Sequence, residues 1–311
     1  MQRLVTLVGG SGFLGTALVE QLARTGARIR VMVRRPAAAH HLKPLGDLGQ
    51  IEIVAGDIRS ESELVRAMEG AFQAVNLVGI LAPSGGASFE AIHAFGAQLA
   101  ADVARRAGAA GFLQVSAIGA DPASPSAYGR SKGEGEALVR KAFPAATVVR
   151  PSLIFGSEDG FTNRFAQLIA TPVPVIPVVA PETRFQPVWV RDVAHGIVEA
   201  LDRPGETFDF GGPEVMTMRE IFAFIGREIG REKRLVDVPD AGARLLASFG
   251  FLPGAPLTMD QYRMLQRDNI VSEDHPGLDT LGIQPIPIGA VAPEWLVRYR
   301  KGGRFAPNTA A

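Results

Sequence analysis

The sequence has 311 residues and contains no cysteine. This absence excludes disulfides, thiolate nucleophiles and zinc–thiolate sites, and it fits a reducing compartment. The five histidines lack the spacing of HExxH or of another metal-binding motif. We therefore expect no metal site in this protein.

The sequence also lacks an excess of either charge and any long apolar run. Lys+Arg and Asp+Glu both number 32, so no net charge attracts nucleic acid and we expect no such partner. No stretch reaches the roughly 18 consecutive apolar residues of a membrane span. The first predicted strand starts near Arg3, which leaves no room for a signal or transit peptide. We expect a cytoplasmic protein, with a peripheral position at an inner membrane as the alternative.

Hydrophobic residues make up 47% of the chain and charged residues 21%, enough for a substantial core. One apolar stretch, Ala243–Leu257, draws attention because it contains ARLLASFGFLPGAPL. We expect it to pack within the protein, since helices of globular domains usually bury such a face. The alternative is that it lies against another apolar surface.

From residue 3 to about residue 150, short apolar runs alternate with helical patterns. This order is typical of a parallel sheet with helices on both faces and right-handed crossovers. We predict an α/β fold, namely a Rossmann-type doubly wound parallel sheet with a smaller interleaved C-terminal substrate lobe. The predicted strands are Leu4–Val8, Ile29–Val33, Ile51–Val54, Ala74–Val78, Phe112–Ser116 and Thr147–Arg150, and the predicted helices are Phe13–Thr25, Glu61–Met68, Phe89–Ala107 and Tyr128–Ala142.

After Pro151 the pattern changes. Residues 156–187 are rich in proline and have little periodicity, as in a substrate-side insertion. Residues 185–201 then predict a strand, a turn and a helix capped by Asp192. We predict a Rossmann domain at 1–155 and a mixed substrate-side lobe at 156–311, with 185–210 returning to the Rossmann domain. Further elements are predicted at Thr207–Phe210, Met218–Ile229, Met259–Arg267 and Glu294–Arg300.

The first strand runs into a glycine turn with the spacing G-x-x-G-x-x-G. The first glycine permits a tight turn, the second lets the backbone approach a pyrophosphate, and the third lets the helix pack on the strand. The N–H groups and positive end of the following helix stabilise a diphosphate. A glycine turn without a ligand is the alternative, but the strand before it and the helix after it favour a dinucleotide. The predicted contacts are Gly9, Ser11, Gly12, Phe13, Leu14 and Gly15.

The end of the second strand predicts which dinucleotide is bound. An NAD site places Asp or Glu there to accept from the ribose 2′-hydroxyl, whereas this chain has Arg34 and Arg35. A guanidinium pairs with a 2′-phosphate, so we predict NADP(H), with NAD(H) as the alternative and two solvated arginines as the simplest reading. After the third strand, Asp57 is suited to accept from the adenine amino group, or it is a turn or capping residue.

A tyrosine and a lysine share one face of a predicted helix. Tyr128 and Lys132 are four residues apart, and Ser116 ends the strand that precedes their helix. A lysine ammonium and an oxidised nicotinamide favour a phenolate, so we expect the pKa of Tyr128 to be lowered. Ser116 would then hold a substrate carbonyl or hydroxyl oxygen while Tyr128 exchanges its proton. A chance YxxxK on an amphipathic helix is the alternative.

With these residues in place, the chain resembles the short-chain dehydrogenase/reductase superfamily, in its extended and atypical branch. Within that branch it is most similar to the nucleotide-binding accessory subunit of respiratory complex I and its bacterial homologues. The resemblance implies an NADP(H)-binding fold with Ser116, Tyr128 and Lys132 at the catalytic positions. The segments that carry it are GGSGFLG, GDI, VNLVGIL, SAIGADPASPSAYGRSKGEGE, RPSLIFGSEDGFTNRFA, TRFQPVWVRDVA and FDFGGPEVMTMREI. It also implies dinucleotide contacts from Ile58, Val78, Gly79, Lys132 and Pro151.

The chain departs from the family in two places. Asn76-Leu77-Val78-Gly79 stands where many members have Asn-Asn-Ala-Gly, and His93 takes the place of an asparagine that faces the active site. His93 either joins a proton relay or has an ordinary packing role, which we favour. Gly96, one turn later, would allow close approach of helix and sheet.

The substrate side is less informative. Gly156, Asn163, Arg164, Arg184 and Gln186 should border a substrate cleft, where an asparagine and an arginine bind a polar or anionic group unless they are simply solvated. The apolar residues of this segment suit a lipid-like or quinone-like molecule, or they are core. They are Phe161, Phe165, Val175, Ile176 and Phe185.

Two functions follow. The first is a cofactor-holding protein of the complex I accessory-subunit type, with peripheral association to a respiratory membrane complex or a link to quinone metabolism. The second is an active NADPH-dependent oxidoreductase or epimerase that uses Ser116, Tyr128 and Lys132 on a small carbonyl or hydroxyl compound.

Overall fold

A single sheet organises the N-terminal half of the chain. Within the described residues, 3–250 and 257–303, the computed structural model forms a seven-stranded parallel sheet in the order β11-β6-β5-β4-β1-β2-β3. The strand order reverses between β1 and β4, and such a switch point is where open α/β sheets bind ligands. The strands are β1 (Leu4–Val8), β2 (Arg28–Val33), β3 (Ile51–Ala55), β4 (Gln73–Asn76), β5 (Gly111–Val115), β6 (Thr147–Pro151) and β11 (Thr207–Phe210).

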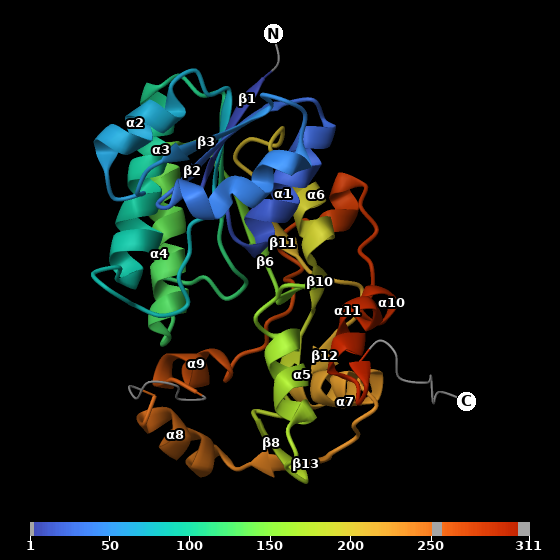
Figure 1. Ribbon diagram of the computed structural model, residues 1–311. Helices are drawn as coiled ribbons and strands as arrows, with labels where there is room; N and C mark the ends of the chain where they lie inside the picture. The colour runs from blue at the N-terminus through green and yellow to red at the C-terminus, as the bar shows by residue number, and fades with distance from the viewer. Residues whose placement is uncertain (1–2, 251–256, 304–311) are drawn as a thin grey trace. The chain divides into compact units, whose positions relative to one another are not determined.

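Helices cover both faces of this sheet, as Figure 1 shows. On one face α1 (Phe13–Arg24) packs against α6 (Val190–Ala200). On the other lie α2 (Glu61–Met68), α3 (Ala97–Arg106) and α4 (Ala127–Ala142). Because both faces are covered, the central strands are buried along their whole length. The predicted fold class is therefore confirmed. Short 3₁₀ segments span Pro36–Leu45 and Leu278–Leu281.

The predicted helix Phe89–Ala107 begins differently from the expectation. Seven residues near its start, Glu90–Gly96, form a π-helix that continues directly into α3. The hydrogen bonds of a π-helix span five residues instead of four, and such segments are often found at functional sites. Apolar spacing does not reveal the difference, because both conformations bury one face of the segment.

The predicted cap of α6 is wrong by one turn. The helix starts at Val190, so Asp192 lies inside its first turn, buried, rather than before it. A carboxylate in the first turn is still favourable there, because it faces the positive end of the helix.

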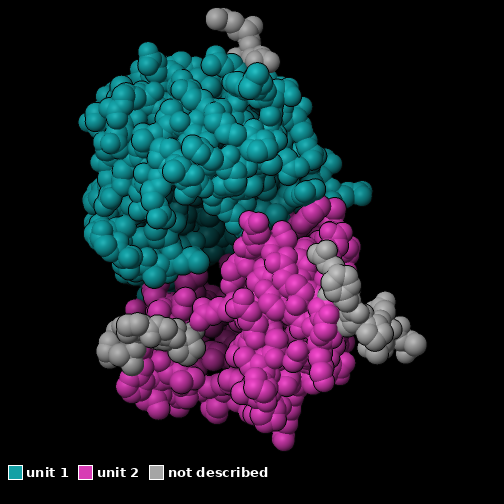
Figure 2. Space-filling model, in the orientation of Figure 1, with its two compact units in different colours: residues 1–151, 190–210, 272–284 teal, residues 152–189, 211–271, 285–311 magenta. Residues whose placement is uncertain are grey.

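The chain separates into two compact units, coloured in Figure 2. Unit 1 contains residues 1–151, 190–210 and 272–284, and unit 2 contains 152–189, 211–271 and 285–311. The sequence analysis places the boundaries at 155 and 185 and does not anticipate the return of 272–284. Contacts between segments so far apart in the chain leave no local signal in the sequence.

Unit 2 has its own core. Phe155, Ile176, Phe222, Ile225 and Trp295 are among its buried side chains. The helices α7 and α9 both begin with a capping box, in which Thr217 pairs with Glu220 and Thr258 with Gln261. The strands are β7 (Ile154–Phe155), β8 (Val175–Val179), β9 (Arg184–Phe185), β10 (Val188–Trp189), β12 (Met216–Thr217) and β13 (Arg234–Val238), and the helices are α5 (Thr162–Ala170), α7 (Met218–Glu228), α8 (Asp240–Ser248), α9 (Met259–Met264), α10 (Ile288–Val291) and α11 (Pro293–Leu296), followed by a 3₁₀ turn at Val297–Tyr299.

The apolar residues of the insertion mostly build this core. Phe165 stacks on Phe222 with ring centroids 4.1 Å apart, and Phe161 lies 4.3 Å from Phe165. Phe185 and Ile176 are buried, whereas Val175 is exposed. Of the two readings of these residues, cleft lining or core, the structure favours core for all except Val175.

The apolar stretch from Ala243 is only partly packed. Ala243 and Ala247 are buried on the inner face of α8, but Leu245, Leu246 and Phe249 are exposed. Residues 251–256 of the stretch lie outside the described residues. The expectation that the whole stretch packs within the protein is therefore wrong for the outer face of α8. In the described part of the chain, no helix is long and apolar enough to span a membrane.

Candidate functional site

The predicted dinucleotide residues lie at one edge of the sheet of unit 1. Strand β1 leads into Gly9, β2 into Arg34, β3 into Asp57, and β5 into Ser116. Because all the strands are parallel, their carboxyl ends meet along the same edge. Gly79 follows β4, and Pro151 ends β6 with its carbonyl accepting from the Ile118 N–H at 3.1 Å.

The glycine turn is built for close approach. Gly9 adopts φ +87°, and its N–H donates to the Met32 carbonyl at 2.9 Å. A Cβ at Gly9 would stand 2.5 Å from Val78 Cγ2, and one at Gly15 would collide with the backbone of Gly10. These two positions therefore require glycine, one for the turn and the other for packing the helix on it.

Gly12 differs, because a Cβ there would meet no atom within 4 Å. Gly12 is the N-cap of α1, no side chain caps the helix, and its first turn holds no acidic residue. The N–H groups at a helix start have no partner within the helix and carry its positive end. Open space in front of uncapped N–H groups fits a diphosphate. Ser11, Phe13 and Leu14 flank this space and are partly exposed.

Two exposed arginines, Arg34 and Arg35, follow β2. The positive charge of Arg34 reaches Asp57, although the larger effect there is the hydrogen bonding of Arg59, which holds the pKa of Asp57 at about 2. The Asp57 carboxylate accepts the backbone N–H and Nε of Arg59 at 2.9 Å and its Nη2 at 2.6 Å. This arrangement is that of a turn residue, and it leaves acceptor capacity on Oδ2 for one more donor. Ile58 beside it is buried.

Ser116 has an unusual environment. Its N–H donates to the Val149 carbonyl at 2.7 Å, and the residue is 4% exposed. Among the described residues, its hydroxyl oxygen is buried without a hydrogen-bond partner. A buried hydroxyl with no partner costs about 1–3 kcal/mol, so such groups usually await a ligand or water.

Tyr128 and Lys132 lie one turn apart at the start of α4, as predicted. Ser126 caps this helix by accepting the Gly129 N–H at 3.2 Å. Lys132 Nζ lies 6.0 Å from the centre of the Tyr128 ring and donates to the Val115 carbonyl at 3.3 Å. A Cβ at Gly79 would stand 3.4 Å from the same Nζ, so the turn after β4 borders the lysine.

Burial shifts the pKa of both members of this pair. Burial lowers the pKa of Lys132 to about 8, with the charge of Glu136 acting against it. Burial raises the pKa of Tyr128 to about 12. In the protein alone, loss of hydration outweighs a lysine 6.0 Å from the ring, and the expected lowering with an oxidised nicotinamide beside Tyr128 stays a prediction.

His93 lies beside Tyr128 with ring centroids 5.4 Å apart and rings edge to face. Its Nε2 accepts the Ile80 N–H at 2.9 Å, and its Nδ1 lies 2.9 Å from Ser131 Oγ. Both nitrogens are engaged within the protein, which favours the packing role over the proton relay. The sequence analysis missed Ser131 and Ile80, because their contact with His93 joins three separate elements.

The predicted polar residues of the substrate side have partners within unit 2. Asn163 donates to the carbonyls of Ser157 and Asp159 and accepts from Tyr299 at 2.9 Å. Arg184 pairs with Asp268, and Gln186 joins the Gly212 carbonyl to the Val271 N–H. The Gly156 N–H donates to Asp159, and Arg164 is exposed. Their role toward a substrate stays a prediction.

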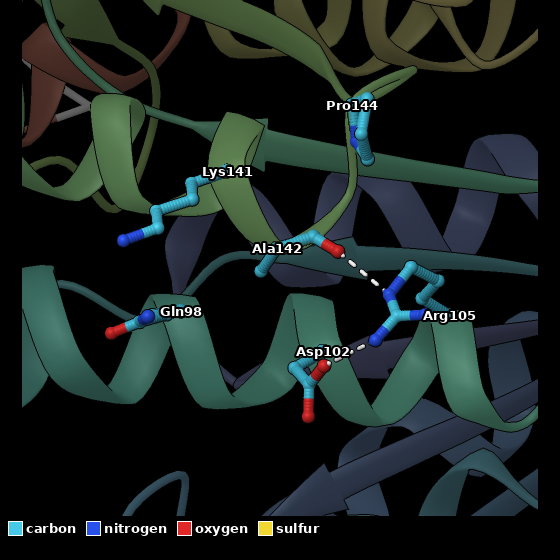
Figure 3. Close-up of a pocket in the computed structure, with 6 residues that line it drawn as sticks. All are labelled: Gln98, Asp102, Arg105, Lys141, Ala142 and Pro144. Carbon is cyan, nitrogen blue, oxygen red and sulfur yellow. Dashed lines mark hydrogen bonds and ion pairs between the residues drawn. The ribbon is translucent and has the colours of Figure 1, made fainter.

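A pocket of about 440 Å³ opens between α3 and the end of α4 (Figure 3). Arg105 links the two helices there by donating to the Ala142 carbonyl and to Asp102, both at 2.9 Å. Lys141 lies thirteen residues beyond Tyr128 on the same helix, about 20 Å along its axis. This pocket is therefore separate from the site described above. Within residues 3–250 and 257–303, no group of His, Asp or Glu side chains could hold a metal ion.

A glycine turn at the switch point of a doubly wound sheet, with a strand-end serine and a Tyr-x-x-x-Lys helix beside it, defines a Rossmann-type dinucleotide-binding protein. The NAD(P)H-binding family model matches residues 9–204. A nucleoside-diphosphate-sugar epimerase from Staphylococcus aureus has the same fold, with 17% identity, a TM-score of 0.71, and coverage of 93% of this chain and 98% of that one. UDP-glucose 4-epimerase from Thermotoga maritima is also similar, with 16% identity, a TM-score of 0.68, and coverage of 95% and 98%.

Similar proteins of known identity show to which branch of this class the chain belongs. Subunit 9 of the mitochondrial NADH dehydrogenase [ubiquinone] 1 alpha subcomplex is 33% identical in Arabidopsis thaliana and 32% in Mus musculus. Each alignment covers 96% of this chain, and 79% and 80% of the two relatives. The chain therefore belongs to the NAD(P)H-binding short-chain dehydrogenase/reductase superfamily, in the branch that contains these subunits of respiratory complex I.

Proposed function

We propose that the protein holds NADP(H) as a lasting part of its structure and serves as an accessory component of a respiratory NADH dehydrogenase. The observation that carries this proposal is the similarity of 32–33% over 96% of the chain to mitochondrial NADH dehydrogenase subunits. By their names, those relatives are subunits of a mitochondrial NADH dehydrogenase. A nucleotide bound only by the folded state stabilises a protein whether or not it reacts.

The residues of unit 1 would divide the dinucleotide between them. The N–H groups from Ser11 to Leu14 would hold the diphosphate, and Asp57 and Ile58 would border the adenine. Val78, Gly79, Lys132 and Pro151 would line the remainder, toward the nicotinamide. When bound in its reduced form, the dinucleotide supplies a hydride.

The preference for NADP(H) over NAD(H) is supported by Arg34 and Arg35, which are exposed after β2 with no acidic residue at the strand end. A guanidinium–phosphate hydrogen bond contributes about 1.5–3 kcal/mol, which is roughly a 10- to 100-fold difference in affinity. We expect Arg34→Gln combined with Arg35→Gln to weaken NADPH binding by that factor and to leave NADH binding unchanged. Arg28→Gln, an exposed arginine at the other end of β2, is the control. Equal losses for both nucleotides would contradict the preference.

Association with a respiratory complex is supported by exposed apolar side chains at the end of α8, namely Leu245, Leu246 and Phe249, the last of which directly follows the helix. Exposed apolar patches are typical of interaction sites. We expect Leu245→Ser with Phe249→Ser to reduce recovery of the tagged protein with the NADH dehydrogenase complex of its own membranes. Phe95→Ser removes an exposed phenylalanine from unit 1 and should not reduce it. Equal recovery of all three proteins would contradict this patch as the docking site.

The second candidate function is an active oxidoreductase or epimerase, favoured by the unpartnered hydroxyl of Ser116. A ceramide reductase from Caulobacter vibrioides is 34% identical over 77% of this chain and 74% of its own length. For this function Ser116 would hold a carbonyl oxygen and the Tyr128 hydroxyl would donate a proton to that oxygen, while the bound dinucleotide would supply the hydride to the carbon. A buried Lys132 then stabilises the phenolate that remains. The substrate would be a small carbonyl compound or a quinone-like molecule.

Two measurements on the purified protein distinguish the two functions, namely the exchange of bound NADPH and its oxidation by added substrates. We expect purified protein to retain NADPH through dialysis and to leave it unoxidised when carbonyl compounds and quinones are added. Oxidation of the NADPH that Tyr128→Phe abolishes, while the nucleotide stays bound, would instead establish the oxidoreductase. Protein that contains and binds no nucleotide would contradict both.

A further inference from the structure

We propose that His93 is a positioning residue that ties the Gly79–Ile80 turn to helix α4 and thereby fixes the surroundings of Lys132. The inference rests on the proposed function only where it concerns nucleotide affinity. Its structural part concerns the contacts of His93 within unit 1.

The hydrogen bonds define which nitrogen of His93 carries the proton. Nε2 accepts the Ile80 N–H at 2.9 Å, so Nε2 must be unprotonated. The proton of the neutral ring is then on Nδ1, which lies 2.9 Å from Ser131 Oγ. Ser131 Oγ donates its own proton to the Tyr128 carbonyl at 2.8 Å and is left with lone pairs for His93. Each donor in this chain of bonds has one acceptor, and no other arrangement satisfies all three contacts.

The packing around the ring leaves it little freedom. His93 is 1% exposed and lies between Phe89, stacked at 5.4 Å, and the edge of Tyr128 at 5.4 Å. The π-helical backbone that carries it touches α4 closely, because a Cβ at Gly135 would collide with the His93 carbonyl. The π-helical segment and α4 therefore fix the imidazole, and the imidazole in turn accepts the N–H of the Gly79–Ile80 turn.

The turn, the imidazole and the lysine meet at Gly79. A Cβ at this residue would stand 3.4 Å from Lys132 Nζ and 3.8 Å from His93 Nε2. Burial and the charge of Lys132 lower the pKa of His93 to about 3, so the ring stays neutral near pH 7. The Nε2 lone pair is occupied by a backbone N–H, which is not a proton donor for a relay. His93 acts on the site only through the positions of its neighbours.

The first test is spectroscopic and needs no nucleotide. In the full chain labelled with ¹⁵N-histidine, we expect His93 to show the Nδ1–H tautomer and no titration between about pH 5 and pH 8, where an ordinary histidine titrates. In Ser131→Ala the Nδ1 signal should shift because its acceptor is gone. The Nε2–H tautomer, or titration in this range, would overturn the inference.

The second test measures affinity and the titration of Lys132. We expect His93→Ala to weaken NADPH binding about tenfold, the factor of one buried hydrogen bond, and to raise the pKa of Lys132 as water enters. His93→Gln keeps an acceptor for the Ile80 N–H and should restore most of the affinity. Thr147→Val removes another buried hydrogen bond of unit 1, to the Arg203 carbonyl, and should change neither quantity.

Failure of the inference and failure of the proposed function give different results. If the unmodified protein binds no NADPH, the proposed function fails, while the tautomer and the Lys132 titration still test His93. If His93→Ala binds NADPH as the unmodified protein does and Lys132 titrates unchanged, His93 is not a positioning residue. Should His93→Ala fail to fold, Ser131→Ala, which removes the partner of Nδ1, takes its place in the comparison of NADPH affinity and Lys132 titration.

Discussion

Gly12 and Gly15 lie in the same turn but meet different surroundings. A Cβ at Gly12 would project into open space, whereas a Cβ at Gly15 would strike the backbone of Gly10. One glycine thus leaves room for something outside the protein, and the other permits packing within it. Adding one methyl group at each position should therefore distinguish an effect on ligand binding from an effect on stability.

We expect Gly12→Ala to fold with a free energy of unfolding within about 1 kcal/mol of the original, because its backbone is extended and suits alanine. Its NADPH affinity should fall about tenfold, since the methyl group occupies the space in front of the helix. Gly15→Ala should instead lower the free energy of unfolding by about 1–3 kcal/mol. Denaturant unfolding and NADPH fluorescence titration measure the two effects, and a Gly12→Ala protein with full affinity would contradict this assignment.

Lys132 predicts a particular dependence of stability on pH. Its pKa is about 8 when folded and near 10.5 ordinarily, so between these values the unfolded chain binds a proton that the folded protein does not. Stability must therefore rise with pH in this window, by on the order of 3 kcal/mol for a buried group whose pKa differs by about 2.5 between the two states. Below about pH 8 both states are protonated and the cost of burying the charge is constant.

Comparison with Lys132→Met isolates this contribution. The free energy of unfolding of the unmodified protein, without nucleotide, should rise relative to that of the variant from about pH 8 to about pH 10.5. Parallel pH profiles for the two proteins would show that Lys132 has an ordinary pKa.

At the scale of elements, close packing of α4 against the π-helical segment positions Tyr128 and Lys132, which lie on α4. Gly135 lies on the face of α4 that touches His93, and Gly133 faces Pro122 at the closest approach of the preceding loop. The helix can approach both neighbours because these positions lack side chains.

We expect Gly135→Ala to separate α4 from the π-helical segment and to lower the free energy of unfolding by about 1–3 kcal/mol. Nucleotide affinity should fall as well, because Tyr128 and Lys132 move with the helix. Gly12→Ala, which adds the same methyl group in open space, is the control for the free energy of unfolding. An unchanged midpoint of denaturation in Gly135→Ala would contradict this packing.

How far the sequence predicts the elements depends on whether their signal is local. Most strands and helices up to Pro151 follow from apolar periodicity and turn residues; Gly26, for example, takes φ +77° directly after the C-cap of α1. The π-helix at Glu90–Gly96 was not foreseen, because its hydrogen-bond register leaves no trace in the apolar pattern. The sequence does not decide whether Phe161 and Phe165 line a cleft or belong to the core, because the proline-rich segment has no periodicity that assigns them to a buried face.

For the whole molecule, the sequence predicts which residues gather at the site but not the hydrogen bonds among them. The alignment of strand ends follows from the parallel sheet and brings the predicted residues to one edge. The bonds of His93 to Ile80 and Ser131 join segments 13 and 38 residues away, and no motif describes them. The raised pKa of Tyr128 in the protein alone does not follow from the motif, because burial cannot be read from a spacing of four residues.

Binding of the dinucleotide to unit 1 should stabilise the folded chain. At a concentration 100 times its dissociation constant, a ligand of the folded state adds about 2.7 kcal/mol. We expect the thermal midpoint to rise with NADPH concentration and to rise less with NADH. A midpoint that is independent of both nucleotides would contradict binding to the folded state.

The central claim is that the turn from Gly9 to Gly15 holds a dinucleotide with a 2′-phosphate. Mass spectrometry of the small molecules released when the purified chain is denatured tests this claim most directly. The account predicts NADP⁺ or NADPH in an amount approaching one molecule per chain. Release of NAD(H) would contradict the role of Arg34 and Arg35, and release of no nucleotide, with none taken up on incubation, would contradict the claim itself.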